Sequence, residues 1–184
     1  MAEQESLFAE KPCPRAARLI DYCRSRQIPE VLPDTIEAGD SWGANCGPMS
    51  LAAVLGLTTV AAARPLVEPF RGFMSPTDML VALHRAGVQS KVGGAPIWPD
   101  FGLVRIQWVG SWCDPSVDRR AAYRYTHWIG ARKIRGPRRK LVIEVYDATP
   151  NRWIPLKEWE EWSPVLWPSR ATGWRLATDI EVRP

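Results

Sequence analysis

The sequence contains no long hydrophobic run. No stretch of its 184 residues stays apolar over the roughly 20 positions that a transmembrane helix needs, so we expect no membrane association. The first residues are acidic and are not followed by the apolar segment of a secretory signal. We therefore expect a cytoplasmic protein, in a compartment that keeps thiols reduced.

Cysteine and histidine are also scarce, at four and two residues. The cysteines Cys13, Cys23, Cys46 and Cys113 form no Cys-x-x-Cys pair and have no metal-ligand spacing with the histidines. The pattern thus predicts neither a metal site nor a bound cofactor. Reduced thiols are compatible with a cysteine that acts as a nucleophile.

The size and composition are those of one globular domain, with 46% hydrophobic and 24% charged residues. We expect a disordered N-terminus over residues 1–11 and a single domain over residues 12–184. Ten tryptophans are unusual. We interpret them as large rings that pack the core of a β-rich second half; the alternative is an aromatic groove for a peptide, a glycan or a base.

The net charge is +4, and much of the excess lies in Arg132–Lys140. Gly136 and Pro137 stand between two strand-like runs there, which predicts the tip of a β-hairpin. A basic cluster can bind nucleic acid, but no aromatic residues alternate with these charges as in a single-strand groove. We therefore expect a solvated tip and no nucleic-acid partner.

Helical patterns fill the first half of the chain and strand patterns the second. We expect helices over 14–27, from Cys46, over 58–67, over 76–86 after an N-capping Ser75, and over 157–162. Loops are expected over 28–43, 93–99 and 112–117, and strands over 103–109, 123–132, 141–146 and 176–182. Helices followed by antiparallel strands predict an α+β fold with the helices on one face of a sheet.

Cys46 is the residue with the clearest chemical setting. Pro48 lies just inside the expected helix and Gly56 just past its end, so Cys46 stands at the helix N-terminus. The partial positive charge there favours a thiolate over a thiol. A buried structural cysteine is the alternative, but the position ahead of the proline favours a nucleophile.

His127 and Asp147 are the candidate partners of Cys46. His127 lies in a strand-like run, whereas His84 lies near a helix C-terminus, where an exposed residue is expected. His127 and Asp147 stand ten residues before and after Pro137, so antiparallel pairing would place them opposite each other, within hydrogen-bonding reach. Asp147 would then orient the imidazole, unless it is an ordinary turn residue and Asn151 takes this role.

Three short segments in this order resemble the C39-like branch of the papain-like cysteine peptidases: Asn45-Cys46-Gly47-Pro48 with Leu51-Ala52, Thr126-His127-Trp128-Ile129, and Tyr146-Asp147. The chain is also similar to small peptidase-like proteins of phages and prophages. The resemblance implies a papain-like fold, with a helical first half packed on an antiparallel sheet. It further implies thiol hydrolysis of a peptide or isopeptide bond in a peptide or protein substrate, through an acyl-enzyme on Cys46 with His127 as the base.

The oxyanion site departs from that family's pattern. The family has a glutamine six residues before the nucleophile, where this chain has Asp40, and a charged carboxylate would repel an oxyanion. Asp40 and its neighbours Ser41 and Trp42 are the candidates, together with the backbone N–H of Cys46. A catalytically weak papain-like binding protein, phage-type, with a Trp-rich or basic binding surface, remains the alternative. The same residues could also cleave an amide or thioester in a small molecule.

Overall fold

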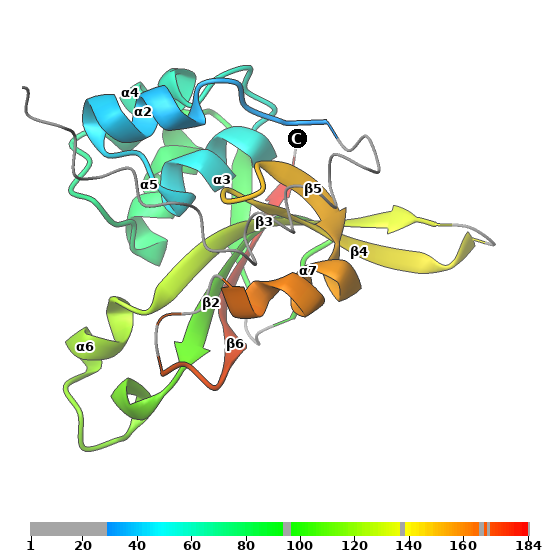
Figure 1. Cartoon of the computed structure of the whole chain (residues 1–184). Helices are drawn as coiled ribbons and strands as arrows, with labels where there is room; N and C mark the ends of the chain where they lie inside the picture. Colours follow the sequence, from blue (N-terminus) through cyan, green and yellow to red (C-terminus); the bar gives the residue numbers. More distant parts are fainter. Residues whose placement is uncertain (1–28, 94–96, 137–138, 166–167, 169, 184) are drawn as a thin grey trace, which may run out of the picture.

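A computed structural model describes residues 29–93, 97–136, 139–165, 168 and 170–183. The predicted disordered segment 1–11 and the predicted helix 14–27 lie outside these residues. The described chain has an α+β architecture, as the order of helical and strand patterns predicts. One antiparallel sheet runs through its centre, with helices on both sides (Figure 1).

The sheet has six strands in the order β1-β6-β2-β3-β4-β5, and all neighbours pair antiparallel. The four predicted strands are confirmed, and two short ones at the edges, β1 and β5, were not predicted. The bounds are β1 Gln89–Val92, β2 Phe101–Val109, β3 Thr126–Arg135, β4 Leu141–Asp147, β5 Arg152–Pro155 and β6 Gly173–Arg183.

The described α-helices are α2 Thr35–Trp42, α3 Cys46–Val54, α4 Arg64–Val67, α5 Pro76–Arg85, α6 Arg119–Tyr123 and α7 Leu156–Trp162. Short 3₁₀ turns are η1 Ala61–Ala63, η2 Ser111–Cys113 and η4 Ser163–Val165. The predicted cap of α5 is confirmed, since Ser75 Oγ accepts from the Asp78 N–H and the Asp78 carboxylate accepts from the Ser75 N–H. None of the described helices has the length and apolar character needed to cross a membrane.

Two local predictions are wrong. The expected loop over 28–43 contains the short helix α2, which is held by tertiary contacts of buried Ala38 and of the Trp42 ring with Phe70. The expected strand from Tyr123 begins only at Thr126. Tyr123, the first residue of the expected strand, is instead the last residue of helix α6. The N-cap of this helix is Asp118, whose side chain accepts a hydrogen bond from the Arg120 N–H.

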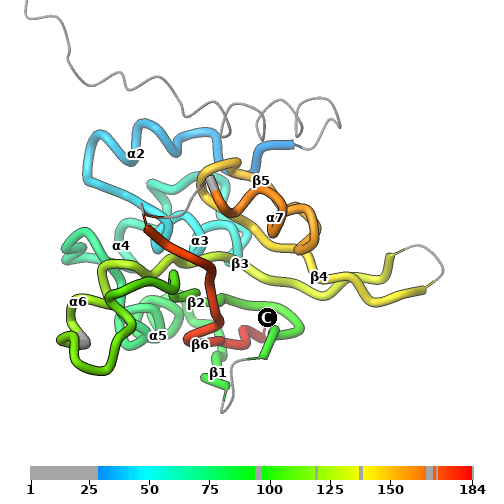
Figure 2. The backbone as a smooth tube through the Cα atoms, turned by 60° about the horizontal axis from the view of Figure 1, so that its bottom comes forward, coloured from blue at the N-terminus to red at the C-terminus, as the bar shows by residue number. Residues whose placement is uncertain are grey.

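The core lies on both faces of the sheet. On one face, residues of α3 and α5 such as Leu51 and Met79 pack against Leu103 and Trp128. On the other face, Trp159 of α7 packs with side chains of β2, β3 and β4, and the two views show α7 apart from α2–α5 (Figures 1 and 2). The expectation that all helices cover one face is therefore wrong for α7.

The described tryptophans pack in this core, as predicted. Four are buried, and none of those in the described part of the chain is exposed: the buried ones are Trp108, Trp112, Trp128 and Trp159. The structure therefore provides no described tryptophan surface of the kind that the aromatic-groove alternative requires.

Strands β3 and β4 form the predicted hairpin, which projects from the body of the molecule (Figure 1). Two of its basic residues already have partners. Arg132 forms an ion pair with Glu144 at 2.6 Å and lies over the Trp153 ring, and Lys133 forms an ion pair with Asp100 at 2.7 Å. Part of the positive charge predicted for a free tip is thus neutralised on the stem.

Candidate active site

Helix α3 presents Cys46 at its first position. Asn45 precedes it in extended conformation and caps the helix, with its Oδ1 accepting the Gly47 N–H at 3.2 Å. The Asn45 amide also donates to Gly72 O at 2.6 Å, which ties the helix start to the segment before α5. The N–H of Cys46 is among the first of the helix, which have no acceptor within it, so it faces outward as a potential donor.

Cys46, His127 and Asp147 are brought together. The Cys46 thiol is hydrogen-bonded to His127 and receives a hydrogen bond from the backbone N–H of Trp128. The Nε2 of His127 lies 2.9 Å from Asp147 Oδ2, which leaves Nδ1 to face the thiol. Ser50 Oγ donates to Trp128 O at 3.0 Å and fixes α3 against β3, so the thiol and the imidazole come from elements that are held together.

The contact between His127 and Asp147 is diagonal. The observed β3–β4 ladder pairs Gly130 with Tyr146 and Arg132 with Glu144, so the hairpin is centred one residue later than Pro137. The prediction that His127 and Asp147 lie directly opposite each other is therefore wrong: Asp147 lies two positions away from the place that this register puts opposite His127. A shift of two keeps both side chains on the same face of the sheet, and diagonal neighbours remain within reach.

Asp147 is fully buried, and each of its oxygens accepts a hydrogen bond. Oδ2 accepts from Trp159 Nε1 at 2.9 Å in addition to His127, and Oδ1 accepts from the Thr149 N–H at 2.9 Å. The Trp108 ring stacks on the His127 ring at a centroid distance of 6.0 Å and an angle of 27°. Tryptophan rings thus cover the imidazole and hold the carboxylate behind it.

These surroundings shift all three pKa values toward the charged forms. Burial on its own would raise the pKa of Cys46, but the charge and hydrogen bond of His127 and the Trp128 N–H lower it. Burial would also lower the pKa of His127, but Asp147 and Cys46 raise it well above the ordinary 6.5. The pKa of Asp147 is lowered: burial opposes ionisation, and the charge of His127 outweighs it, with help from hydrogen bonds. The direction of each shift favours a thiolate and an imidazolium beside a carboxylate.

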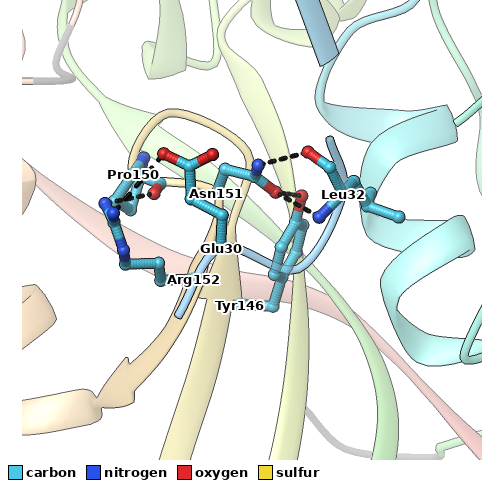
Figure 3. Close-up of polar contacts among 6 residues, drawn as sticks. All are labelled: Glu30, Leu32, Tyr146, Pro150, Asn151 and Arg152. Carbon is cyan, nitrogen blue, oxygen red and sulfur yellow. Dashed lines mark hydrogen bonds and ion pairs between the residues drawn. The ribbon is translucent and has the colours of Figure 1, made fainter. Parts of the chain in front are cut away.

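Asn151 does not take the place of Asp147. Its side chain accepts hydrogen bonds from the Leu32 N–H at 3.1 Å and the Tyr146 hydroxyl at 3.0 Å, and donates to Leu32 O at 2.5 Å (Figure 3). Beside it, Arg152 contacts Glu30 at 3.4 Å. Asn151 therefore fastens the segment around Leu32 to the turn between β4 and β5, and both ends of its amide are engaged there.

A cleft of about 340 Å³ opens in front of Cys46. It is lined by Asn45, Cys46, Gly72, Phe73, Met74, Ser75, Arg105, Tyr123, Arg124, Thr126 and Trp128. The oxyanion candidates Asp40, Ser41 and Trp42 are not among these residues, whereas Cys46, the fourth candidate through its backbone N–H, is. Asp40 and Ser41 are exposed on the last turn of α2, where they line a separate hollow with Pro33, and Trp42 packs on Phe70.

The second histidine and the other cysteines lie away from these contacts or outside the described residues. His84 lies exposed in the last turn of α5 as expected, and Cys113 is a half-buried free thiol whose Sγ lies 3.5 Å from Trp108 O. Cys13 and Cys23 lie outside the described residues. Within the described ranges, no three His, Cys, Asp or Glu side chains are grouped so as to hold a metal ion.

Three residues contribute to the site in ways that the sequence did not reveal: Asn45 caps α3, Trp159 donates to Asp147, and Arg105 lines the cleft. Asn45 carries a recognisable signal, because Asn directly before a helix is a preferred N-cap. Trp159 and Arg105 reach the site only through the folding of distant segments, and no local pattern marks them.

No protein-family model matches the chain, and a search of curated proteins finds no similar sequence. Support for an activity therefore comes from the geometry and the electrostatics of the site itself.

Proposed function

We propose that the protein is a cysteine peptidase-like hydrolase of papain-like fold, which cleaves a peptide or isopeptide bond through an acyl-enzyme on Cys46. The observation that carries the proposal is the hydrogen-bonded series Cys46–His127–Asp147 at the N-terminus of α3, facing a cleft. A helix that carries the cysteine, packed on an antiparallel sheet that carries the histidine and the aspartate, is the arrangement that the papain-like resemblance implies. The working thiol is reduced, which fits a cytoplasmic compartment.

Acylation begins from the ion pair. The Cys46 thiolate attacks the carbonyl carbon of the scissile bond, a C–S bond forms, and the carbonyl π electrons move to oxygen. His127 then gives its proton to the leaving nitrogen as the C–N bond breaks. The products of this step are a thioester on Cys46, a free amine and a neutral His127.

Deacylation returns the enzyme to its starting state. Neutral His127 takes a proton from water, and the resulting hydroxide equivalent attacks the thioester carbon. The C–S bond breaks, which releases the carboxylic acid and the Cys46 thiolate next to a protonated His127. Asp147 keeps the imidazole in one orientation throughout and stabilises its charged form.

The oxyanion is stabilised in this proposal by the backbone N–H of Cys46 at the positive end of α3. No other donor from the predicted set lines the cleft. This observation favours the second candidate, a catalytically weak papain-like protein that binds a partner in the same cleft. The two candidates differ in turnover and share the reactive thiol.

The experiment is digestion of a proteome-derived peptide library, with new peptide termini identified by mass spectrometry. We expect a set of cleavages that appears with the wild-type protein and is absent with Cys46→Ala and with His127→Ala. The double variant is expected to be no worse than either single variant, because the pair acts as a unit. If peptides are bound but never cleaved, the result supports the binding protein and contradicts the hydrolase. Cleavage that persists in Cys46→Ala would contradict the proposal.

A further inference from the structure

Among the described residues, Arg105 is a buried charge without a counter-ion. It lies on β2 opposite Trp128 of β3 and is 9% exposed. Its Nε is buried and has no hydrogen-bond partner in the described part of the chain, and none of the ion pairs between described residues includes it. Its guanidinium lies 5.1 Å from the centre of the Tyr123 ring and hydrogen-bonds to that side chain. Because a buried charge is costly unless it is paired, Arg105 calls for a partner that the described residues do not supply.

Arg105 lines the cleft that contains Cys46. Arg124 lines the same cleft, and no acidic side chain does. A neighbouring hollow of about 470 Å³ shares Arg105 and Tyr123 with the cleft and adds Arg175. Charges of one sign on low-dielectric walls concentrate ligands of the opposite sign. The arrangement therefore favours an anionic ligand next to the thiol.

We propose that the cleft selects peptides with a carboxylate close to the bond that Cys46 attacks, and that Arg105 is its main contact. The inference deepens the proposed function and rests on it for the identity of the reaction. An arginine fork matches the two oxygens of a carboxylate, and a carboxylate supplies the counter-ion that Arg105 does not find among the described residues. Phe73 and Tyr123, 68% and 57% exposed, border the cleft and offer apolar contact to the residue next to the acid.

Two small alkylating agents test this preference without any turnover. Iodoacetate carries a carboxylate and iodoacetamide does not, and both alkylate a thiolate. At Cys46 we measure the rate with iodoacetate divided by the rate with iodoacetamide, and we divide this by the same ratio for glutathione. We expect the normalised ratio to be well above one. A hydrogen bond to a charged group contributes about 1.5–3 kcal/mol, so Arg105→Met should reduce this normalised ratio by about tenfold or more.

The control is a charge removed elsewhere. Arg135 is exposed at the end of β3 and does not line the cleft, so Arg135→Gln should leave the ratio unchanged. If the normalised ratio falls equally in Arg135→Gln and Arg105→Met, net charge explains the effect and a contact with Arg105 does not. A ratio that Arg105→Met does not change would overturn the inference.

Stability separates a binding role from a structural one. Replacing an uncompensated buried charge by an apolar side chain of similar length is often neutral or stabilising, so we expect the Tm of Arg105→Met to be unchanged or raised. A Tm lowered by several degrees, with the ratio unchanged, would assign Arg105 to the core instead. If Arg105→Met does not fold, Arg124→Gln at an exposed position gives the second test, with an expected two- to threefold fall in the ratio.

Protection of Cys46 against iodoacetamide identifies the source of the carboxylate. The probes are N-acetyl-Ala-Glu-Ala-amide, its Gln counterpart, N-acetyl-tri-alanine with a free carboxyl end, and inorganic phosphate. Protection by the Glu peptide indicates a side-chain acid, and protection by tri-alanine indicates a C-terminus; either supports the inference. Equal protection by the Gln peptide, or protection by phosphate alone, would overturn it.

These results are independent of hydrolysis. A protein that shows the Arg105-dependent preference but cleaves no peptide would keep the carboxylate site and lose the hydrolase. Cleavage that shows no preference for acidic peptides and does not respond to Arg105→Met would support the hydrolase and contradict the carboxylate site.

Discussion

His127 and Asp147 share a hydrogen bond of 2.9 Å between Nε2 and Oδ2, although the hairpin that carries them does not pair them directly. The carboxylate lies in the interior with its other contacts already made, to Trp159 and to the backbone after β4. The bond therefore fixes both the orientation of the imidazole and the nitrogen that it turns toward Cys46.

The first prediction separates Asp147 from Asn151. Asp147→Asn should lower kcat/KM by roughly 10²- to 10⁴-fold, because a neutral amide stabilises the imidazolium form of His127 less than a buried carboxylate does. Asn151→Ala should leave kcat/KM within about twofold but lower the free energy of unfolding by about 1–3 kcal/mol, since it leaves buried partners at Leu32 and Tyr146 unsatisfied. Steady-state kinetics and urea unfolding measure the two effects, and a catalytic loss confined to Asn151→Ala would reverse the assignment.

The second prediction concerns Trp159. Its indole N–H is one of the groups that lower the pKa of Asp147, and Trp159→Phe removes it while keeping an aromatic ring. A carboxylate with a lowered pKa stabilises the fold above its unfolded pKa of 3.8, and this contribution is lost as the pH falls through the folded pKa. We expect Trp159→Phe to be less stable than wild type by about 1.5–3 kcal/mol at pH 7, and the gap to narrow as Asp147 becomes protonated.

Urea unfolding at pH 7 and near pH 3 measures this difference. Trp42→Phe is the matched control, because the Trp42 ring packs on Phe70 away from the carboxylate. A gap between Trp159→Phe and wild type that stays constant with pH would indicate lost packing alone and would contradict the positioning role.

The third prediction follows from the mutual dependence of the pKa values. The Cys46 thiolate is one cause of the raised pKa of His127, so Cys46→Ala should lower that pKa. The raised pKa of His127 contributes stability that is present below its unfolded value of 6.5 and is lost as the pH rises through the folded pKa. NMR titration resolves the two histidines, with His84 on α5 as the internal reference. An identical His127 titration in wild type and Cys46→Ala would refute the ion pair.

The fourth prediction concerns Asp40. Because Asp40 is exposed on α2 and does not line the cleft, Asp40→Gln should change kcat by less than about twofold. A carboxylate in the oxyanion site would give a different result, since gaining one donor there raises turnover by up to ~100-fold. Steady-state kinetics on any cleaved peptide distinguish the two, and a gain of that size would return Asp40 to the site.

The sequence predicted those features that depend on local pattern. The periodicity of the strands, the Ser75 cap and the start of a helix at Cys46 all follow from neighbouring residues, and the structure confirms them. The meeting of His127 and Asp147 was also accessible, because a tight turn fixes which residues of a hairpin share a face. The register itself was predicted wrongly, since the residue at which the turn is centred depends on how the strands pack.

Features that depend on tertiary contacts could not be predicted. Helix α2 is only eight residues long and is held in place by contacts with the segment near Phe70. The indole of Trp159 reaches Asp147 because α7 covers the second face of the sheet. Arg105 looks like any arginine in a strand, and only the fold shows that it is buried beside the cleft and has no counter-ion in the described part of the chain.

The most direct test of the thiolate–imidazolium site is the alkylation rate of Cys46 by iodoacetamide as a function of pH, read by mass spectrometry of the modified peptides. We expect rapid labelling of Cys46 near pH 6, where an ordinary thiol of pKa about 8.5 is almost entirely protonated, and slow labelling of Cys113. In His127→Ala the reactivity of Cys46 should move up toward the pH range of an ordinary thiol. Labelling of Cys46 no faster than that of Cys113 at pH 6, or a profile that His127→Ala leaves unchanged, would contradict the account.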